Sequence, residues 1–343
     1  MSRYLLRIPA GPGNPRNSEG SFALLRNGQI LFAYTRFSGG DHDDSKADIV
    51  ARRSHDGGRS WDRNDRILVG STEAGQNVMS VSLARLSNGK LALVYLVKHG
   101  LHDCRPHLRL SDDDGTTWSP ARCLIPSPGY YVVNNDRLIV LSDGSLLLPA
   151  AKHGVLRHAN GAVSLDPVGR SLVLMGSADA ASWRPCEPDF PGQVGVGMQE
   201  PGVIALPDGT WWLWARGDQG WQWQSFSADR GQTWTPPTAS PFASPCSPLS
   251  MRQLGDGRLV AVWNQPDGRA MPSSWGRTPL VWAVSTDGRA WSKPTAIEDD
   301  PDNGFCYIAI FPHGNGALLA YCVGGKNGTS PLSGLVVRRL HIP

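Results

Sequence analysis

The segment at residues 54–61 (SHDGGRSW) recurs along the chain with the pattern Ser-x-Asp-x-Gly-x-Ser/Thr-Trp. Full copies occupy residues 111–118 and 227–234, and shortened copies occupy residues 177–183 and 285–291. Asp and Ser side chains readily form hydrogen bonds with backbone N–H groups inside a tight turn, while the Trp supplies a large apolar surface beside it. These repeated turns predict a protein built from several units of one architecture.

A hairpin pattern precedes each copy of this turn and occurs once more near the C-terminus. Two apolar segments with period-two alternation flank an Asn-Gly or Asp-Gly dipeptide, which accepts the positive φ of a two-residue β-turn. The predicted hairpins span residues 21–37, 78–97, 137–151, 203–215, 249–264 and 308–323. A third strand follows each hairpin and in most units leads into the repeated turn, and outer strands follow the turn, as at residues 66–70, 121–125 and 293–297.

The octads resemble the Asp boxes of sialidase-like propellers, and this resemblance covers essentially the whole chain. It implies an all-β fold, a six-bladed β-propeller of the sialidase type with Asp-box turns. The last unit ends at residues 335–342 without a box, so we expect the N-terminal segment at residues 4–8 to supply its outer strand. Residues 1–343 are therefore predicted to form a single propeller domain that carries the catalytic site.

Composition and charge exclude several classes of protein. Gly (39 residues) and Pro (27) are abundant while charged residues make up only 18%, which suits short strands and turns. The formal charge of +3 is too small to indicate a nucleic-acid or membrane partner. No apolar run reaches the length of a signal-peptide core or a membrane span, which predicts a cytoplasmic protein. The six cysteines lack metal-ligand spacing, so we expect buried free thiols.

Polar residues gather at the strand ends opposite the Asp-Gly turns. In a four-stranded unit, these ends bring together the starts of first strands and the ends of second strands. The candidate substrate-binding residues there are Arg36, Arg105, Asn135, Asp136, His153 and Gln219. Because converging polar groups are costly unless they meet a ligand or each other, this rim is the predicted site, with a solvated loop surface as the alternative.

Three segments of the rim resemble bacterial sialidases. Residues 199–216 (QEPGVIALPDG followed by WAR) are similar to the sialidase segment in which a Glu polarises a tyrosine and an Arg binds the substrate carboxylate. Arg277 resembles a further carboxylate-binding Arg, and Tyr307 resembles the catalytic tyrosine. The resemblance implies that Tyr307 is the nucleophile, Glu200 its base, and Arg216 and Arg277 ligands of a carboxylate.

These residue types suit that chemistry. Forked guanidinium groups bind a planar carboxylate through two hydrogen bonds. A Glu beside a phenol takes its proton, which makes the tyrosine a usable nucleophile toward an anomeric carbon that bears a carboxylate. The structural alternatives are a buried core phenol at Tyr307 and ion pairs between units for Arg216 and Arg277.

The front of the chain departs from the sialidase pattern. Sialidases carry a first substrate-binding Arg in a motif similar to residues 6–9 (LRIP), but Arg7 falls in a predicted outer strand. Arg16, at the start of the first inner strand, is the better candidate. No Asp stands where the acid/base is expected, so Asp41 is predicted to take this role, with His42 beside it as a substrate-binding residue.

We therefore expect an exo-glycosidase of sialidase-like type, which hydrolyses a terminal carboxylated sugar such as a sialic acid. An acidic glycan is the expected partner, neither a cofactor nor a metal is required, and no oligomeric state is assigned, although the acids at residues 41–44 form a candidate cation site. The basic rim, with His153 among its members, keeps open a polysaccharide lyase that abstracts the C5 proton of a uronic acid. A non-catalytic glycan-binding propeller is the third interpretation.

Overall fold

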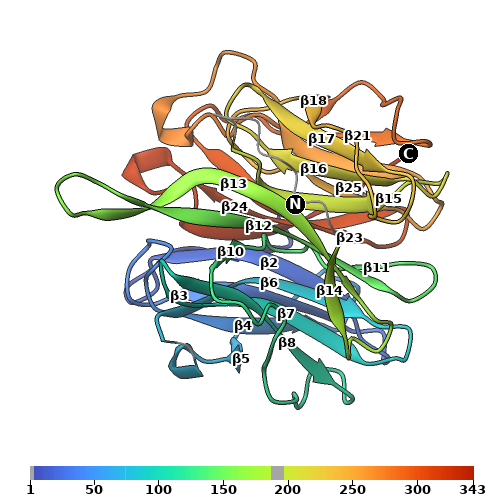
Figure 1. Cartoon of the computed structure of the whole chain (residues 1–343), viewed down its shortest axis with the longest axis horizontal. Helices are drawn as coiled ribbons and strands as arrows, with labels where there is room; N and C mark the ends of the chain where they lie inside the picture. Colours follow the sequence, from blue (N-terminus) through green and yellow to red (C-terminus); the bar gives the residue numbers. More distant parts are fainter. Residues whose placement is uncertain (1–3, 74, 187–196) are drawn as a thin grey trace.

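Strands make up most of the protein because its sequence alternates apolar and polar residues over short stretches. The computed structural model describes residues 4–73, 75–186 and 197–343. The helical segments among them are three short 3₁₀ turns, η1 (Ser71–Glu73), η2 (Pro272–Ser274) and η3 (Lys326–Gly328). The predicted all-β class is confirmed (Figure 1). No helix in these ranges is long and apolar enough to cross a membrane.

Three sheets of the described chain are simple four-stranded antiparallel meanders. The first contains β2 (Arg16–Leu24), β3 (Ile30–Phe37), β4 (Ala47–Ser54) and β5 (Arg66–Val69). The second contains β15 (Gln199–Ala205), β16 (Trp211–Arg216), β17 (Trp221–Ser227) and β18 (Thr238–Ala243). The third contains β19 (Ser250–Gln253), β20 (Leu259–Asn264), β21 (Leu280–Ser285) and β22 (Thr295–Glu298).

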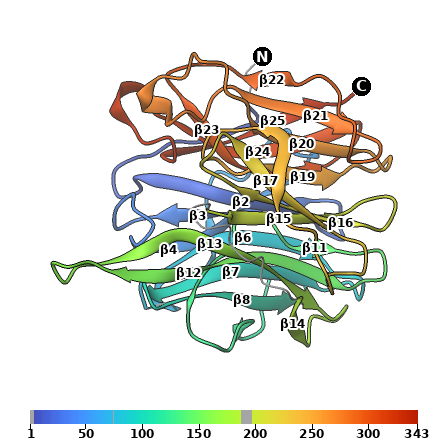
Figure 2. The ribbon, with the colours of Figure 1, turned by 45° about the horizontal axis from the view of Figure 1, so that its top comes forward.

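A nine-stranded sheet joins two such groups of strands. One group is β6 (Asn77–Arg85), β7 (Leu91–Gly100), β8 (Asp103–Ser111) and β9 (Arg122–Cys123). The other is β11 (Ile139–Val140), β12 (Leu146–Arg157), β13 (Val163–Gly176) and β14 (Trp183–Cys186). The short strand β10 (Tyr130–Val132) connects them, because it pairs antiparallel with β12 and parallel with β8. Figures 1 and 2 show the β12–β13 hairpin projecting beyond the neighbouring strands.

The remaining sheet brings the two ends of the chain together. It contains β23 (Gly304–Pro312), β24 (Gly316–Gly324) and β25 (Gly334–His341), and β1 (Leu6–Ile8) pairs antiparallel with β25. The N-terminal strand therefore takes the outer position that the sequence predicts for it. The predicted hairpins are also confirmed as the pairs β2–β3, β6–β7, β11–β12, β15–β16, β19–β20 and β23–β24.

The sheets contact one another mainly through their first strands, and one group uses its second strand, β12, as well. Strand β2 packs against both β6 and β23, β6 contacts β11, β12 contacts β15, and β19 contacts both β15 and β23. Apolar clusters fill the spaces between neighbouring sheets; one contains Leu31 and Ile49 of the first sheet together with Leu93 and Tyr95 of the next. The strand ends therefore converge on a common region, which places residues distant in sequence close together.

The repeated Ser-x-Asp turns have the hydrogen bonds expected from their sequence. In residues 54–61, Asp56 accepts hydrogen bonds from the backbone N–H groups of Arg59 and Ser60 and from the Ser60 hydroxyl. Asp113 and Asp229 accept the equivalent bonds from Thr117 and Thr233. Trp61, Trp118 and Trp234 of these turns each pack against an apolar cluster, so the turns are anchored to the hydrophobic core.

A recurring β-bulge interrupts four of the first strands. The register shifts between Ser18 and Ser21 in β2, and equivalent shifts occur in β6, β15 and β23. Each bulge holds a non-glycine residue at positive φ, namely Glu19 (59°), Ser80 (58°), Glu200 (46°) and Tyr307 (57°). Such residues are uncommon, and a bulge re-aims its side chain away from the regular alternation of the strand.

The cysteines only partly follow the expectation of buried thiols. All six are free, and Cys104, Cys186, Cys306 and Cys322 are buried. Cys123 is partly exposed and Cys246 is exposed, because Cys246 lies in the connection between β18 and β19 rather than within a strand. The prediction of burial is therefore wrong for Cys246.

Candidate active site

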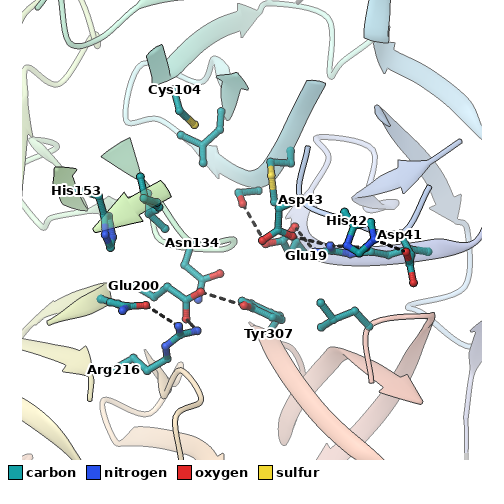
Figure 3. A pocket seen from close by; sticks show the side chains of 18 of the residues that line it. Glu19, Asp41, His42, Asp43, Cys104, Asn134, His153, Glu200, Arg216 and Tyr307 are labelled. Atoms are coloured by element: carbon teal, nitrogen blue, oxygen red, sulfur yellow. Dashed lines mark hydrogen bonds and ion pairs between the residues drawn. The ribbon is translucent and has the colours of Figure 1, made fainter. Parts of the chain in front are cut away.

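The bulged residues lie around a cavity of about 510 Å³. Its wall includes side chains from five sheet regions, and Figure 3 shows Glu19, Asn134, Glu200 and Tyr307 directed toward this cavity. The predicted residues that line it are Arg16, Asp41, His42, His153, Glu200, Arg216, Arg277 and Tyr307. The tertiary structure thus brings together residues spread from the first strands to the last.

A hydrogen-bonded chain connects a phenol, a carboxylate and a guanidinium (Figure 3). The Tyr307 hydroxyl donates to Oε1 of Glu200 over 3.0 Å, and Nη1 of Arg216 donates to Oε2 of the same carboxylate over 2.8 Å. Nη2 of Arg216 also donates to Oε1 of Gln199 over 2.6 Å. Burial, and secondarily the charge of Glu200, raises the pKa of Tyr307 well above its ordinary value, so the phenol is neutral until its proton is transferred.

Arg277 is a buried cation without an acidic partner in the described parts of the chain. It is 8% exposed, its Nη1 lies 3.0 Å from Sγ of Cys306, and its Nε has no hydrogen-bond partner. Its Cζ lies 5.3 Å from the centre of the Tyr307 ring. Burial opposes its charge, but nearby Cys306, Tyr307 and Glu200 raise the pKa of Arg277 overall. A buried guanidinium with spare donors is suited to bind an anion.

Arg16 also lines the cavity and is 2% exposed. Its Nη1 donates to Oδ1 of Asp43 over 2.6 Å and to the backbone oxygen of Asp41 over 3.1 Å. Its guanidinium carbon lies 4.3 Å from the centre of the Phe37 ring. Desolvation opposes ionisation of Asp43, but the Arg16 charge outweighs it and lowers the pKa of Asp43. Arg7, by contrast, is exposed in β1, which agrees with the preference for Arg16.

Glu19 is a cavity residue that the sequence analysis did not select. It is 4% exposed, and its carboxyl group accepts hydrogen bonds from Ser80 Oγ over 3.1 Å and from Ser18 Oγ over 3.3 Å. Burial raises the pKa of Glu19 to about 7, although Arg16 partly opposes this shift. The sequence marks residue 19 only as the start of an inner strand, and period-two alternation does not reveal the bulge that turns Glu19 toward the cavity.

Asp41 and His42 occupy the mouth of the cavity, on the connection between β3 and β4. The Asp41 side chain is 49% exposed and its Oδ1 lies 3.7 Å from Nε2 of His42. The contact with Arg16 goes through the Asp41 backbone oxygen, whereas the carboxylate that pairs with Arg16 belongs to Asp43. Within the part of the chain that the structure describes, no group of three His, Cys, Asp or Glu side chains is arranged to hold a metal ion. The acids at residues 41–44 therefore do not form such a group.

His153 lines the cavity, and one of its ring nitrogens has no hydrogen-bond partner among the described residues. Its Nδ1 lies 2.9 Å from the backbone oxygen of Asp166, and since a carbonyl only accepts, Nδ1 carries the hydrogen. Burial lowers the pKa of His153, so the ring is neutral near pH 7. Its Nε2 is a buried acceptor that has no partner among the described side chains.

Five predicted substrate-binding residues lie outside this cavity, namely Arg36, Arg105, Asn135, Asp136 and Gln219. Arg36 forms ion pairs with Asp48 and Asp65 on its own sheet, and Arg105 is paired with Asp103. Gln219 is exposed in the turn between β16 and β17. These predictions were wrong in placement, because Arg36 in β3 and Arg105 in β8 bind acids of their own strand groups and Gln219 is exposed to solvent.

Asn135 and Asp136 lie beneath the cavity and support the backbone around it. Asn135 Nδ2 donates to the backbone oxygens of Gly20 (2.7 Å) and Tyr307 (3.2 Å). Asp136 accepts hydrogen bonds from Ser21 Oγ (2.8 Å) and from the Ile310 backbone N–H (3.0 Å). They hold the first strands together, so the prediction that they contact substrate was wrong about their place.

Solved structures with this fold include sialidases. The intramolecular trans-sialidase from Ruminococcus gnavus superposes with a TM-score of 0.73 at 13% identity, covering 97% of this chain and 96% of that chain. A NanB sialidase mutant from Streptococcus pneumoniae superposes with a TM-score of 0.72 at 14% identity, covering 99% and 71%. A Dyadobacter fermentans protein of unknown function gives 0.75 at 15% identity, covering 98% and 99%. The class is therefore an all-β protein with a sialidase-like fold.

The sequence comparison agrees with this class. A family model described as a BNR repeat-like domain matches residues 28–319, and the chain belongs to this family. A sialidase from Micromonospora viridifaciens is 24% identical over 254 residues, which cover 68% of this chain. The matched region spans 38% of that relative's length.

Proposed function

We propose that the chain is a six-bladed β-propeller that hydrolyses a terminal carboxylated sugar, such as a sialic acid, from a glycan. The strand order supports the propeller, because the two halves of the nine-stranded sheet and the four other sheets are each groups of four antiparallel strands. The contacts between neighbouring groups form a closed cycle: β23 with β2, β2 with β6, β6 with β11, β12 with β15, β15 with β19 and β19 with β23, while β11 and β12 belong to one hairpin. Such a ring protects most strand edges.

The single observation that carries the proposed activity is the buried Arg277 guanidinium, which has no carboxylate partner in the described chain and faces Arg16 and Arg216 around one cavity. Three guanidinium groups around a cavity of sugar size suit a ligand with a planar carboxylate. Polar side chains that line the same cavity, among them Gln199 and Asn134, add hydrogen-bonding groups to these guanidinium groups. An acidic sugar supplies both a carboxylate for the guanidinium groups and hydroxyl groups for the other polar side chains.

The Tyr307–Glu200 pair supports hydrolysis through a covalent intermediate. Glu200 accepts the phenolic proton over the existing 3.0 Å hydrogen bond as the Tyr307 oxygen attacks the anomeric carbon. A neutral phenol avoids the repulsion that a carboxylate nucleophile would experience from the carboxylate of the sugar. Arg216, bonded to the other Glu200 oxygen, holds that carboxylate in place and shares its charge. Water then releases the sugar from Tyr307 in the second step.

The test is incubation of the purified chain with a panel of α-sialosides and uronate-capped oligosaccharides, with released acidic sugar quantified by chromatography. We expect release of free sialic acid or a related acidic sugar by the unaltered protein, and a loss of at least about 1,000-fold in kcat for Tyr307→Phe. Tyr307→Phe keeps the ring and removes only the oxygen, and equal melting temperatures of the two proteins would control for folding. Binding without release, unaffected by Tyr307→Phe, would instead identify a glycan-binding propeller.

A specific observation favours a second candidate, a polysaccharide lyase. His153 lines the cavity and is neutral near pH 7, which is the protonation state that a base needs to remove the C5 proton of a uronic acid. A lyase product contains an unsaturated uronate that absorbs ultraviolet light, whereas hydrolysis creates no such chromophore. Absorbance recorded during the same incubation therefore separates the two reactions.

A further inference from the structure

Glu19 is a buried carboxyl group that the roles proposed above leave unused. It lines the same cavity as Tyr307, and Figure 3 shows both groups directed into that space from different strands. Arg16 Nη2 lies 3.7 Å from Oε2 of Glu19, and Ser80 of the neighbouring sheet donates to Oε1 over 3.1 Å. These contacts hold the carboxyl group in one orientation at the cavity wall.

The backbone at Glu19 matches the backbone at the two central residues of the proposed reaction. Glu19, Glu200 and Tyr307 each occupy the positive-φ position of a bulge in the first strand of their sheet. A strained backbone of this kind costs about 1–3 kcal/mol for a non-glycine residue and persists where the surrounding structure enforces it. In all three cases the bulge turns a functional side chain toward the cavity.

The surroundings of Glu19 favour a protonated carboxyl group near neutral pH. Burial is the largest influence, and Asp43 and Glu200 add to it, whereas Arg16 and the Ser80 hydroxyl lower the pKa of Glu19; together these leave it at about 7. The ionisable groups that face Glu19 from the surrounding elements are Arg16, Asp43, Tyr130, Glu200, Tyr307 and Cys322. Such a group both gives and takes a proton at working pH.

The two other acids near Arg16 are less suited to donate a proton. Asp43 forms a 2.6 Å ion pair with Arg16, which holds it as a carboxylate. Asp41 has a half-exposed side chain at the cavity mouth, and its own contact with Arg16 uses the backbone oxygen. Glu19 is the buried acid of this wall.

We infer that Glu19, rather than Asp41, is the acid/base of the reaction, an inference that rests on the proposed hydrolysis. In the first step the Glu19 O–H gives its proton to the glycosidic oxygen. The bond from the anomeric carbon to that oxygen breaks, its electron pair stays on the departing alcohol, and the Tyr307 oxygen bonds to the anomeric carbon while Glu200 takes the phenolic proton. In the second step ionised Glu19 takes a proton from water, whose oxygen replaces Tyr307, and Tyr307 regains its proton from Glu200.

Glu19→Gln tests this assignment with two substrates that differ only in leaving group. Sialyllactose needs protonation of its leaving oxygen, whereas 4-nitrophenyl sialoside does not, because 4-nitrophenolate is a stable anion. We expect kcat for sialyllactose to fall at least about 100-fold. With the aryl substrate we expect one rapid equivalent of 4-nitrophenol followed by slow turnover, because the second step still lacks its base. Azide, a nucleophile that needs no base, accelerates that slow phase and yields a sialosyl azide.

Two further variants complete the experiment. Asp41→Asn is the matched control and should show neither the burst nor the azide response. Ser80→Ala keeps the Glu19 carboxyl but removes a hydrogen bond that lowers its pKa. The pH at which kcat begins to fall should therefore be higher in Ser80→Ala, because Glu19 keeps its proton up to a higher pH.

The outcomes separate this inference from the proposed function. An unaltered protein that releases no acidic sugar from any sialoside or uronate-capped oligosaccharide overturns both. An active protein whose Glu19→Gln variant, with an unchanged melting temperature, still hydrolyses sialyllactose at a similar rate overturns the role of Glu19 alone. The burst and azide response appearing in Asp41→Asn instead, or an unmoved pH profile in Ser80→Ala, also overturns it.

Discussion

Individual residues of this cavity show how backbone strain and chemistry coincide. Glu19, Ser80, Glu200 and Tyr307 all stand at positive φ, where side chains other than glycine are rarely found. Each is turned out of the strand alternation that would have pointed it into an apolar core or at a neighbouring sheet. The hydrogen bonds Ser80–Glu19 and Tyr307–Glu200 then connect residues from different sheets, so the strain of each bulge is balanced by contacts that only the assembled site provides.

Arg277→Lys should weaken substrate binding more than it lowers the rate at which bound substrate reacts. Lysine keeps the charge but lacks the planar fork that makes two parallel hydrogen bonds to a carboxylate. We expect kcat/KM for a sialoside to fall about 10–100-fold, mainly through a higher KM. Steady-state kinetics on both parameters would check this.

Arg105→Gln is the control for Arg277→Lys, because Arg105 pairs with Asp103 outside the cavity. It should leave kcat/KM within about twofold. A similar loss in both variants would mean that general surface charge, rather than a specific carboxylate contact, attracts the substrate.

Among the structural elements, the repeated turns stabilise the ends of the third strands. Asp113 accepts hydrogen bonds from the backbone and hydroxyl of Thr117 and from the Ser111 hydroxyl. The Ser111 oxygen in turn accepts from the Gly115 backbone, which adopts a φ of 76°. Trp118 then packs against an apolar cluster shared by two sheets. Turn geometry and sheet packing are therefore fixed together.

Asp113→Ala should lower the melting temperature by about 2 °C at pH 7. The hydrogen bonds from Thr117 lower the pKa of Asp113 to about 2, below its value in the unfolded chain. A carboxylate whose pKa is lowered in the folded state contributes its full stabilisation of the fold at pH values above its unfolded-state pKa of about 4. This contribution is lost as the pH falls toward about 2. Urea unfolding of both proteins from pH 7 to pH 3 should show the difference shrink below about pH 4.

Asp112→Ala provides the comparison from the same turn, because the exposed Asp112 carboxylate pairs only with Lys90 among the described residues. It should change the free energy of unfolding by less than about 0.5 kcal/mol at any of these pH values. Equal effects from Asp112→Ala and Asp113→Ala would contradict the role assigned to the turn hydrogen bonds.

In the molecule as a whole, the last sheet depends on both ends of the chain. Strand β1 pairs with β25 from Leu6↔Val337 to Ile8↔Leu335, and Ile8 is 5% exposed within the apolar cluster of this sheet and the first one. Without β1, the β25 edge would present unpaired backbone groups, which favours association between molecules. The contact of β23 with β2 then joins this sheet to the first.

Ile8→Ala should therefore lower the free energy of unfolding by about 2–4 kcal/mol, because it removes buried methyl groups where the two chain ends meet. The measurement is urea unfolding followed by Trp fluorescence. Arg7→Ala, at the exposed neighbouring position of the same strand, should cost less than about 1 kcal/mol. Comparable losses for the two variants would show that the strand stabilises through its backbone pairing and not through the buried side chain.

The sequence alone was sufficient for the all-β class, the hairpins and the outer position of the N-terminal strand, because these depend on local periodicity and turn chemistry. It also selected Glu200, Arg216, Arg277 and Tyr307, because the residues around them resemble sialidase segments. In the structure these four residues line one cavity. Arg16 was placed correctly by counting strands, since the first residue of an inner strand reaches the central region.

Only the tertiary structure decided which rim residues face the cavity. Arg36, Arg105 and Gln219 have the polarity of site residues, yet the two arginines pair with acids away from the cavity and Gln219 is exposed in a turn. Glu19 looked like an ordinary strand residue, and a bulge, which inserts one residue without any local sequence signal, placed it against Ser80 of another sheet. Local patterns determine elements, whereas burial and partner choice depend on contacts between residues far apart in the chain.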